Sequence, residues 1–77
     1  MNSAKAQLFR DRAMGATKRE RTRGVLLDSA VSVFAEKGFS GAKIRDITDR
    51  AKLANGTFYN YYQTKDELLR DVATELA

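Results

Sequence analysis

The feature that most constrains this chain is a pair of short helical stretches with only three residues between them. Apolar and small residues recur at helical spacing over residues 44–51, and a second stretch opens at residue 55 and runs to about residue 61. Residues 52–54 must therefore turn the chain tightly from one helix into the next. This pattern predicts a helix-turn-helix unit whose second helix carries outward polar groups.

Two further helices complete the predicted fold. An apolar stripe predicts a first helix over residues 18–37, capped by Thr17 and ended by Gly38. Thr64 can cap a last helix whose apolar stripe still continues at residue 77, so we expect a chain that is cut before a larger domain. The expected fold class is all-α, a three-helix helix-turn-helix bundle of the homeodomain-like kind with the start of a fourth helix.

The composition excludes several classes of chemistry. The 77 residues include no cysteine and no histidine, so disulfides, thiolate chemistry, finger-type zinc sites and the usual neutral-pH general base are absent. The hydroxyls and lysines that remain have no base to activate them. We therefore expect no enzymatic activity, no metal site and no cofactor.

Positive charge is concentrated at the start of the chain. Residues 1–23 hold seven basic and two acidic side chains, a net charge of +5, whereas the whole chain carries +4. Such a segment attracts a polyanion such as DNA, although a solvated leader has the same composition. We expect residues 1–16 to form a flexible basic arm, residues 17–63 the helix-turn-helix domain, and residues 64–77 the start of a connecting helix.

The sequence offers no membrane-targeting signal. No apolar run approaches the ~20 residues that a membrane span needs, and no apolar stretch follows the basic N-terminal residues as it does in a signal peptide. The absence of cysteine also suits a reducing compartment. We expect a cytoplasmic protein with no membrane partner.

The helical stretch over residues 55–61 separates a core side from an outward side. At about 100° per residue, Phe58 and Tyr62 point one way and the polar residues point the other. A glycine on the outward side lets the backbone approach a phosphate or base edge, asparagine amides can pair with adenine, and tyrosine hydroxyls can reach phosphates. The outward and flanking candidates are Asn55, Gly56, Thr57, Tyr59, Asn60 and Tyr61.

Two cations outside this stretch are further candidates for DNA contact. Arg45 lies outward at the beginning of the 44–51 helix, where it can reach a phosphate or a guanine. Lys65 begins the last helix, whose free amide groups also favour phosphate. Without further information, either side chain can equally be an ordinary solvated charge.

These residues resemble the TetR-type repressors. The resemblance covers about residues 21–76 and runs through VLLDSAVSVFAEKGF and IRDI to its most specific part, GTFYNYYQTKDELL. It implies DNA contacts at Gly56, Thr57, Tyr59, Tyr61 and Lys65, core positions at Phe58 and Tyr62, and a base-reading position at Arg45. It also implies a homodimer formed by a C-terminal domain absent from this chain, a palindromic double-stranded DNA operator, and a small-molecule effector in that domain that releases the repressor from DNA.

Three residues depart from the pattern of the family. Lys43 replaces the Ser or Thr that usually caps the 44–51 helix, which removes a hydroxyl and offers a cation for DNA contact instead. Lys52 replaces the glycine of the turn, so a residue with a side chain is expected to adopt the left-handed conformation unless the turn differs. Ala54 replaces the Ser or Thr that usually caps the 55–61 helix. This change costs roughly 1 kcal/mol of helix stability unless Asn55 takes the capping role.

A different class of function also fits the composition. A helical interaction module, with a basic arm and a tyrosine-rich face, would bind a protein or an acidic membrane surface. In that case, removal of Tyr59, Tyr61 and Lys65 would leave partner binding intact.

Overall fold

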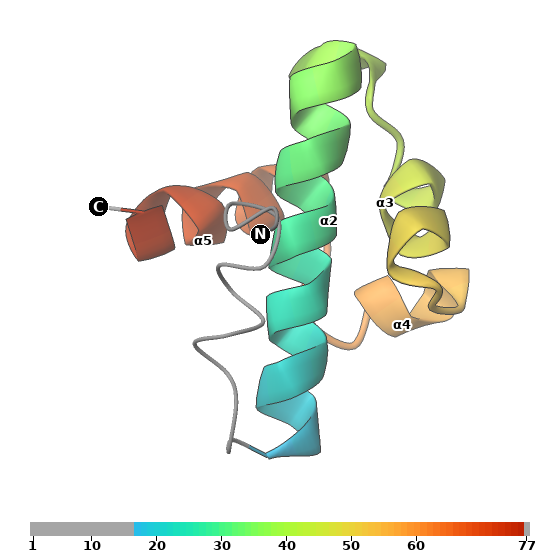
Figure 1. The fold of residues 1–77 in the computed structure, drawn as a ribbon, viewed down its shortest axis with the longest axis vertical. Coiled ribbons are helices and arrows are strands. Elements are labelled where there is room, and N and C mark those ends of the chain that lie inside the picture. Colours follow the sequence, from blue (N-terminus) through green and yellow to red (C-terminus); the bar gives the residue numbers. More distant parts are fainter. Residues whose placement is uncertain (1–16, 77) are drawn as a thin grey trace, which may run out of the picture.

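The computed structural model describes residues 17–76 as four helices, with no strand in that range. They are α2 (Lys18–Gly41), α3 (Ile44–Ala51), α4 (Asn55–Phe58) and α5 (Lys65–Leu76). Figure 1 shows α2 along the length of the molecule, with α3 and α4 on one side and α5 on the other. The all-α prediction is confirmed, whereas the predicted arm over residues 1–16 lies outside the described residues.

The first helix begins at the predicted residue because its N-terminus is capped from both directions. The Thr17 hydroxyl accepts the Glu20 backbone N–H at 3.2 Å, and the Glu20 carboxylate accepts the Thr17 backbone N–H at 3.0 Å. This reciprocal pair is a capping box, which satisfies two amide groups that have no partner within the helix.

The end of α2 differs in detail from the prediction. Gly38 leaves helical geometry at φ 75°, which breaks the helix where the sequence predicted its end. One further helical turn then forms up to Gly41, and the Ala42 N–H donates to the carbonyls of Gly38 and Phe39. Only residues 42–43 are therefore non-helical between α2 and α3, although the sequence predicted that the first helix ends before Gly38, because the chain forms a helical turn again after the glycine.

The turn between α3 and α4 has the strained geometry that the sequence predicted. Lys52 follows α3 in the left-handed conformation, at φ 60° and ψ 43°. The next residue, Leu53, donates its N–H to the Thr48 carbonyl at 2.9 Å and packs partly buried against the core. A lysine thus occupies a conformation that normally favours glycine, and the three-residue turn is retained.

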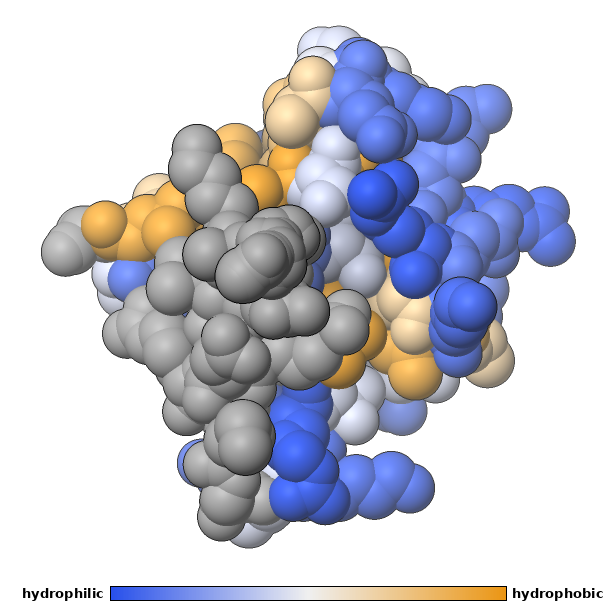
Figure 2. All heavy atoms as spheres, viewed as in Figure 1, coloured by the Kyte–Doolittle hydropathy of each residue, from blue (hydrophilic) through white to orange (hydrophobic). Residues whose placement is uncertain are grey.

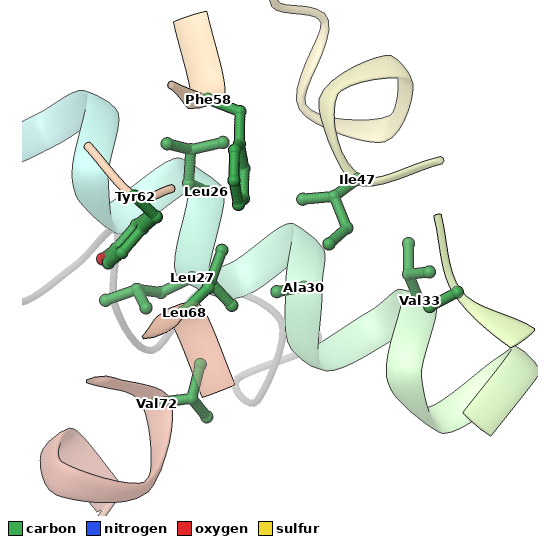
Figure 3. Packing of buried hydrophobic residues seen from close by; sticks show 10 residues of the cluster. Leu26, Leu27, Ala30, Val33, Ile47, Phe58, Tyr62, Leu68 and Val72 are labelled. Atoms are coloured by element: carbon green, nitrogen blue, oxygen red, sulfur yellow. The ribbon is translucent and has the colours of Figure 1, made fainter. Parts of the chain in front are cut away.

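All four helices contribute to one hydrophobic core. In Figure 3, Phe58 of α4 and Ile47 of α3 point toward Leu26 and Ala30 of α2, all four with no exposed surface. Leu68 and Val72 of α5 reach the other side of α2, near Leu27; the remaining buried members are Val33, Ala42 and Tyr62. Because Phe58 anchors α4 in this core, the core fixes the position of the short second helix of the helix-turn-helix unit.

The described helices include none that is both long enough and apolar enough to cross a membrane.

Candidate nucleic-acid interface

The segment of residues 55–61 is only partly an α-helix. α4 ends at Phe58, and the chain continues in tight turns in which Tyr59, Asn60 and Tyr61 each donate their N–H to the carbonyl three residues earlier, at 3.0–3.1 Å. The sequence predicted a helix to about residue 61, so the extent of the segment agrees but its second half has the tighter hydrogen-bond pattern. No side chain caps the start of α4 at Ala54, as the sequence predicted.

The two sides of the 55–61 segment are separated as predicted. Phe58 is fully buried and Tyr62 is 8% exposed, whereas Tyr59 is 52% exposed. Gly56 and Asn60 are also exposed, and Thr57 and Tyr61 are half-buried at the edges. Two aromatic residues therefore hold the segment in the core while the polar residues between them face outward.

Gly56 is open to solvent in a way that the fold itself does not require. A Cβ atom built on Gly56 meets no heavy atom within 4 Å, and its φ is not in the left-handed range. Neither backbone conformation nor internal packing therefore demands glycine at this position. The surface over residue 56 is left clear for another molecule to approach the backbone.

Asn55 does not take the capping role that the sequence left open. Its side-chain Oδ1 accepts from the Thr48 hydroxyl at 3.4 Å, which links the start of α4 to α3. Thr48 is fully buried, and its single hydroxyl hydrogen is shared among Asn55 Oδ1 and the Ile44 and Arg45 carbonyls, at 3.2–3.4 Å. The contact turns the acceptor oxygen of Asn55 toward α3, while the residue as a whole remains exposed.

Lys43 and Arg45, the two candidates near the start of α3, are both exposed. The Lys43 backbone N–H donates to the Asp46 carboxylate at 3.0 Å, and the Lys37 ammonium lies 3.3 Å from the same carboxylate. That backbone hydrogen bond, assisted by Lys37, holds the pKa of Asp46 below its usual range. The space-filling view in Figure 2 shows strongly hydrophilic residues over α3 and apolar ones over α5.

Lys65 has an intramolecular role that sequence reasoning missed. Its ammonium donates to the carbonyls of Phe39 and Ala42, each at 2.7 Å, and lies 4.5 Å from the centroid of the Phe39 ring. These carbonyls belong to the end of α2 and the residue after it, where a cation is favoured. Lys65 therefore ties the start of α5 to the end of α2.

A second tie joins α5 to the first half of α2. The Arg23 guanidinium donates to both Asp71 oxygens, at 2.7 and 3.0 Å, and to Glu75 at 3.1 Å. Tyr62, which directly follows the 55–61 segment, donates its hydroxyl hydrogen to Asp71 at 2.5 Å. These contacts connect α2, the chain after α4, and α5 through one carboxylate.

The charges in this cluster shift each other's ionisation. The hydrogen bonds to Asp71 and Glu75 raise the pKa of Arg23. Burial and the hydrogen bond to Asp71 raise the pKa of Tyr62, whereas for Asp71 burial is outweighed by the donors Arg23 and Tyr62, which lower its pKa. Arg23 belongs to the basic N-terminal segment in the sequence, but two carboxylates balance its charge.

Arg19 makes a long-range contact with the 55–61 segment. Its Nη2 donates to the Asn60 carbonyl at 3.0 Å, and the guanidinium carbon lies 4.3 Å from the centroid of the Tyr61 ring. Figure 1 shows the chain that leaves α4 passing beside the N-terminal half of α2. No sequence signal identified this pair, because the two partners are 41 residues apart.

Comparison with known proteins gives a family for this fold and surface. Residues 26–72 match the family model described as bacterial regulatory proteins, tetR family. The matched range contains α3, the turn, α4 and most of α2 and α5. No solved structure matches the chain.

The chain is also similar to curated bacterial proteins. It is 36% identical over 66 residues to the HTH-type transcriptional repressor Rv3405c of Mycobacterium tuberculosis (strain ATCC 25618 / H37Rv), covering 86% of this chain and 35% of the relative. It is 34% identical over 62 residues to the HTH-type transcriptional repressor KstR2 of the same strain, covering 80% of this chain and 30% of the relative.

A third relative comes from another genus. The chain is 41% identical over 51 residues to the uncharacterized HTH-type transcriptional regulator YvdT of Bacillus subtilis (strain 168), covering 66% of this chain and 26% of the relative. The aligned regions thus span about a third or less of the length of these relatives. Because the family model matches most of the described helices, the chain belongs to the TetR family of bacterial regulatory proteins.

Proposed function

We propose that this chain is the sequence-specific DNA-binding domain of a transcriptional regulator, in which the 55–61 segment enters the major groove. The observation that carries the proposal is the division of this segment: Phe58 and Tyr62 are buried in the core, while Gly56, Tyr59 and Asn60 face solvent. A helix-turn-helix unit reads DNA with such a segment, positioned by its own hydrophobic anchors.

Each outward residue has a role in this proposal. The open backbone at Gly56 approaches a phosphate or a base edge, and Asn60 offers an amide to adenine. Thr57 contacts a phosphate or a thymine methyl group, and the hydroxyls of Tyr59 and Tyr61 bind phosphates on either side. Asn55 retains its amide N–H groups for a base or phosphate.

The cations contribute in different ways. Lys43 and Arg45 are exposed near the start of α3 and add phosphate contacts or, for Arg45, a guanine contact. Lys65 places two of its three N–H groups on carbonyls, which leaves one donor for a phosphate. The net charge of +5 over residues 1–23 increases the attraction to DNA at low salt.

The complete regulator is proposed to act as a cytoplasmic homodimer on a palindromic operator. In this proposal, a C-terminal domain outside this chain forms the dimer and binds a small-molecule effector, which releases the repressor from DNA. Two of the relatives described above are named as repressors, and the aligned regions cover about a third of their length. The half-sites of such an operator would follow the two-fold axis of the protein.

An amide NMR titration of the 77-residue chain with a mixed-sequence DNA duplex tests the DNA-binding proposal. We expect chemical-shift changes at residues 43–65 that weaken as salt is raised, because phosphate contacts release counterions. A Tyr59→Ala variant should bind more weakly, since it removes an exposed side chain outside the core. Asp49→Ala, which changes an exposed residue of α3 that is not proposed to touch DNA, is the control.

The same titration can contradict the proposal. Shifts confined to residues 1–23, with Tyr59 and Lys65 unaffected, would reduce DNA binding to a basic tail and favour the interaction-module alternative. No shift at any salt concentration would remove the DNA-binding proposal altogether.

A further inference from the structure

The second half of the 55–61 segment is held by tight turns, by a ring contact between Phe58 and Tyr59, and by partial packing of Tyr61 against the core. α4 contains only four residues, and the turns that follow use hydrogen bonds between residues three apart. Helices this short are marginal without tertiary contacts, and the carbonyls at a helix end need partners from elsewhere. The exposed Tyr59 and Asn60 and the half-buried Tyr61 all lie in this half.

Arg19 supplies such a partner from α2. One guanidinium group donates to the Asn60 carbonyl at 3.0 Å and at the same time lies over the Tyr61 ring, 4.3 Å from its centroid. A planar guanidinium can stack flat on a ring while its N–H groups point sideways to a carbonyl, whereas an ammonium has no planar face to stack. The positive charge also suits the carbonyl end of a helical turn.

The helix that carries Arg19 is itself well anchored. Arg19 lies in the first turn of α2, between the two partners of the capping box, Thr17 and Glu20. One turn further along, Arg23 is bound to Asp71 and Glu75 of α5. The contact therefore connects the end of the 55–61 segment to a helix that is anchored at both of these places.

We propose that Arg19 is a positioning residue for DNA recognition, which holds Asn60 and Tyr61 in the orientation needed to meet the duplex. Its effect is exerted through these two residues and not through a phosphate contact of its own. The inference rests on the proposed DNA-binding function, and it adds a residue outside the helix-turn-helix unit to the determinants of recognition.

The test compares Arg19→Ala and Arg19→Lys with the unmodified 77-residue chain, using Lys18→Ala as the control. Lys18 is an exposed cation of the same helical turn, so the control removes the same charge at nearly the same place. The first measurement is backbone order in the free chain, from 15N relaxation and amide hydrogen exchange at residues 59–62. The second is affinity for the duplex as a function of salt concentration.

We expect Arg19→Ala to lower the order of residues 59–62 in the free chain while α3 and α5 stay unchanged. Its affinity for DNA should fall by about two- to fivefold relative to Lys18→Ala, the size expected for one exposed cation–π contact. The slope of log affinity against log salt should match that of the control. Arg19→Lys should fall between Arg19→Ala and the unmodified chain.

Two results would overturn the inference. If residues 59–62 remain as ordered in Arg19→Ala as in the unmodified chain, Arg19 does not position them. If the salt slope falls by about 0.9 more than in Lys18→Ala, the value for one phosphate contact, Arg19 binds the DNA backbone directly. Failure of the unmodified chain to bind any duplex would instead refute the proposed function, and the order measured in the free chain would still decide whether Arg19 holds the segment.

Discussion

Replacement of Gly56 by alanine adds one carbon atom, which should have opposite effects on the stability of the chain and on its affinity for DNA. The added Cβ meets no heavy atom within 4 Å, and the backbone at this residue is not in the left-handed range. Alanine is favoured over glycine in a helix by about 0.5–1 kcal/mol, so Gly56→Ala should stabilise the free chain by up to that amount. For a domain of this size, the melting temperature should rise by roughly 2–8 °C.

The same methyl group should weaken DNA binding. If the backbone at Gly56 lies against the duplex, the methyl group overfills a packed contact at a cost of roughly 1–3 kcal/mol. That energy corresponds to an affinity loss of about 5- to 150-fold. The prediction is therefore a variant that is more stable and binds less tightly, measured by thermal unfolding and by fluorescence anisotropy with a labelled duplex.

Gly41→Ala is the matched control. A Cβ at Gly41 meets the Lys37 Cβ at 3.7 Å, an ordinary contact, and the residue lies at the far end of α2 from the 55–61 segment. This variant should bind DNA as tightly as the unmodified chain. Unchanged DNA affinity of Gly56→Ala, or a marked fall in its melting temperature, would refute the reasoning.

Three further predictions concern stability. Lys52→Gly should raise the free energy of unfolding, measured in urea, by up to about 1 kcal/mol, because glycine adopts the left-handed conformation without strain. An unfolding free energy below that of the unmodified chain would show that the lysine is not strained. Asp71 has a lowered pKa in the folded chain, so its contribution to stability is present above the ordinary aspartate pKa of about 3.9 and is lost as pH falls through the pKa of the folded state. Asp71→Asn should therefore be less stable than the unmodified chain at neutral pH and should lose less stability as pH is lowered. Urea unfolding at a series of pH values measures this, and an equal loss of stability in acid for both chains would contradict it. Tyr62 has a raised pKa in the folded chain, so its contribution to stability is present below the ordinary tyrosine pKa of about 10 and declines as pH rises above it. The difference in unfolding free energy between the unmodified chain and Tyr62→Phe should therefore become smaller above about pH 10. A difference that stays constant with pH would contradict this prediction.

The sequence predicted the features that local rules determine. The cap at Thr17, the break at Gly38 and the left-handed Lys52 each depend on a few neighbouring residues, and all are present. The burial of Phe58 and Tyr62 followed from helical periodicity alone. Periodicity does not distinguish an α-helix from tighter turns, which is why α4 was predicted to extend beyond Phe58.

The contacts that the sequence did not predict join distant segments. Arg23 and Asp71 are 48 residues apart, and Lys65 reaches carbonyls 23 and 26 residues away. When only the sequence is known and the packing of the helices is not, each of these side chains is interpreted as a solvated surface charge. The DNA contacts themselves stay predictions, because they depend on a partner and not on the fold of this chain.

The alternation of buried aromatic and outward polar residues in the 55–61 segment has an evolutionary consequence. The core constrains Phe58 directly, whereas Gly56, Tyr59 and Asn60 are exposed to solvent and lie outside the core. Substitutions at these outward positions can accumulate without loss of the folded state, since surface changes are usually within ±0.5 kcal/mol. If these outward residues read DNA as proposed, duplicated copies of such a chain can diverge toward different operators through few substitutions that leave the core at Phe58 unchanged.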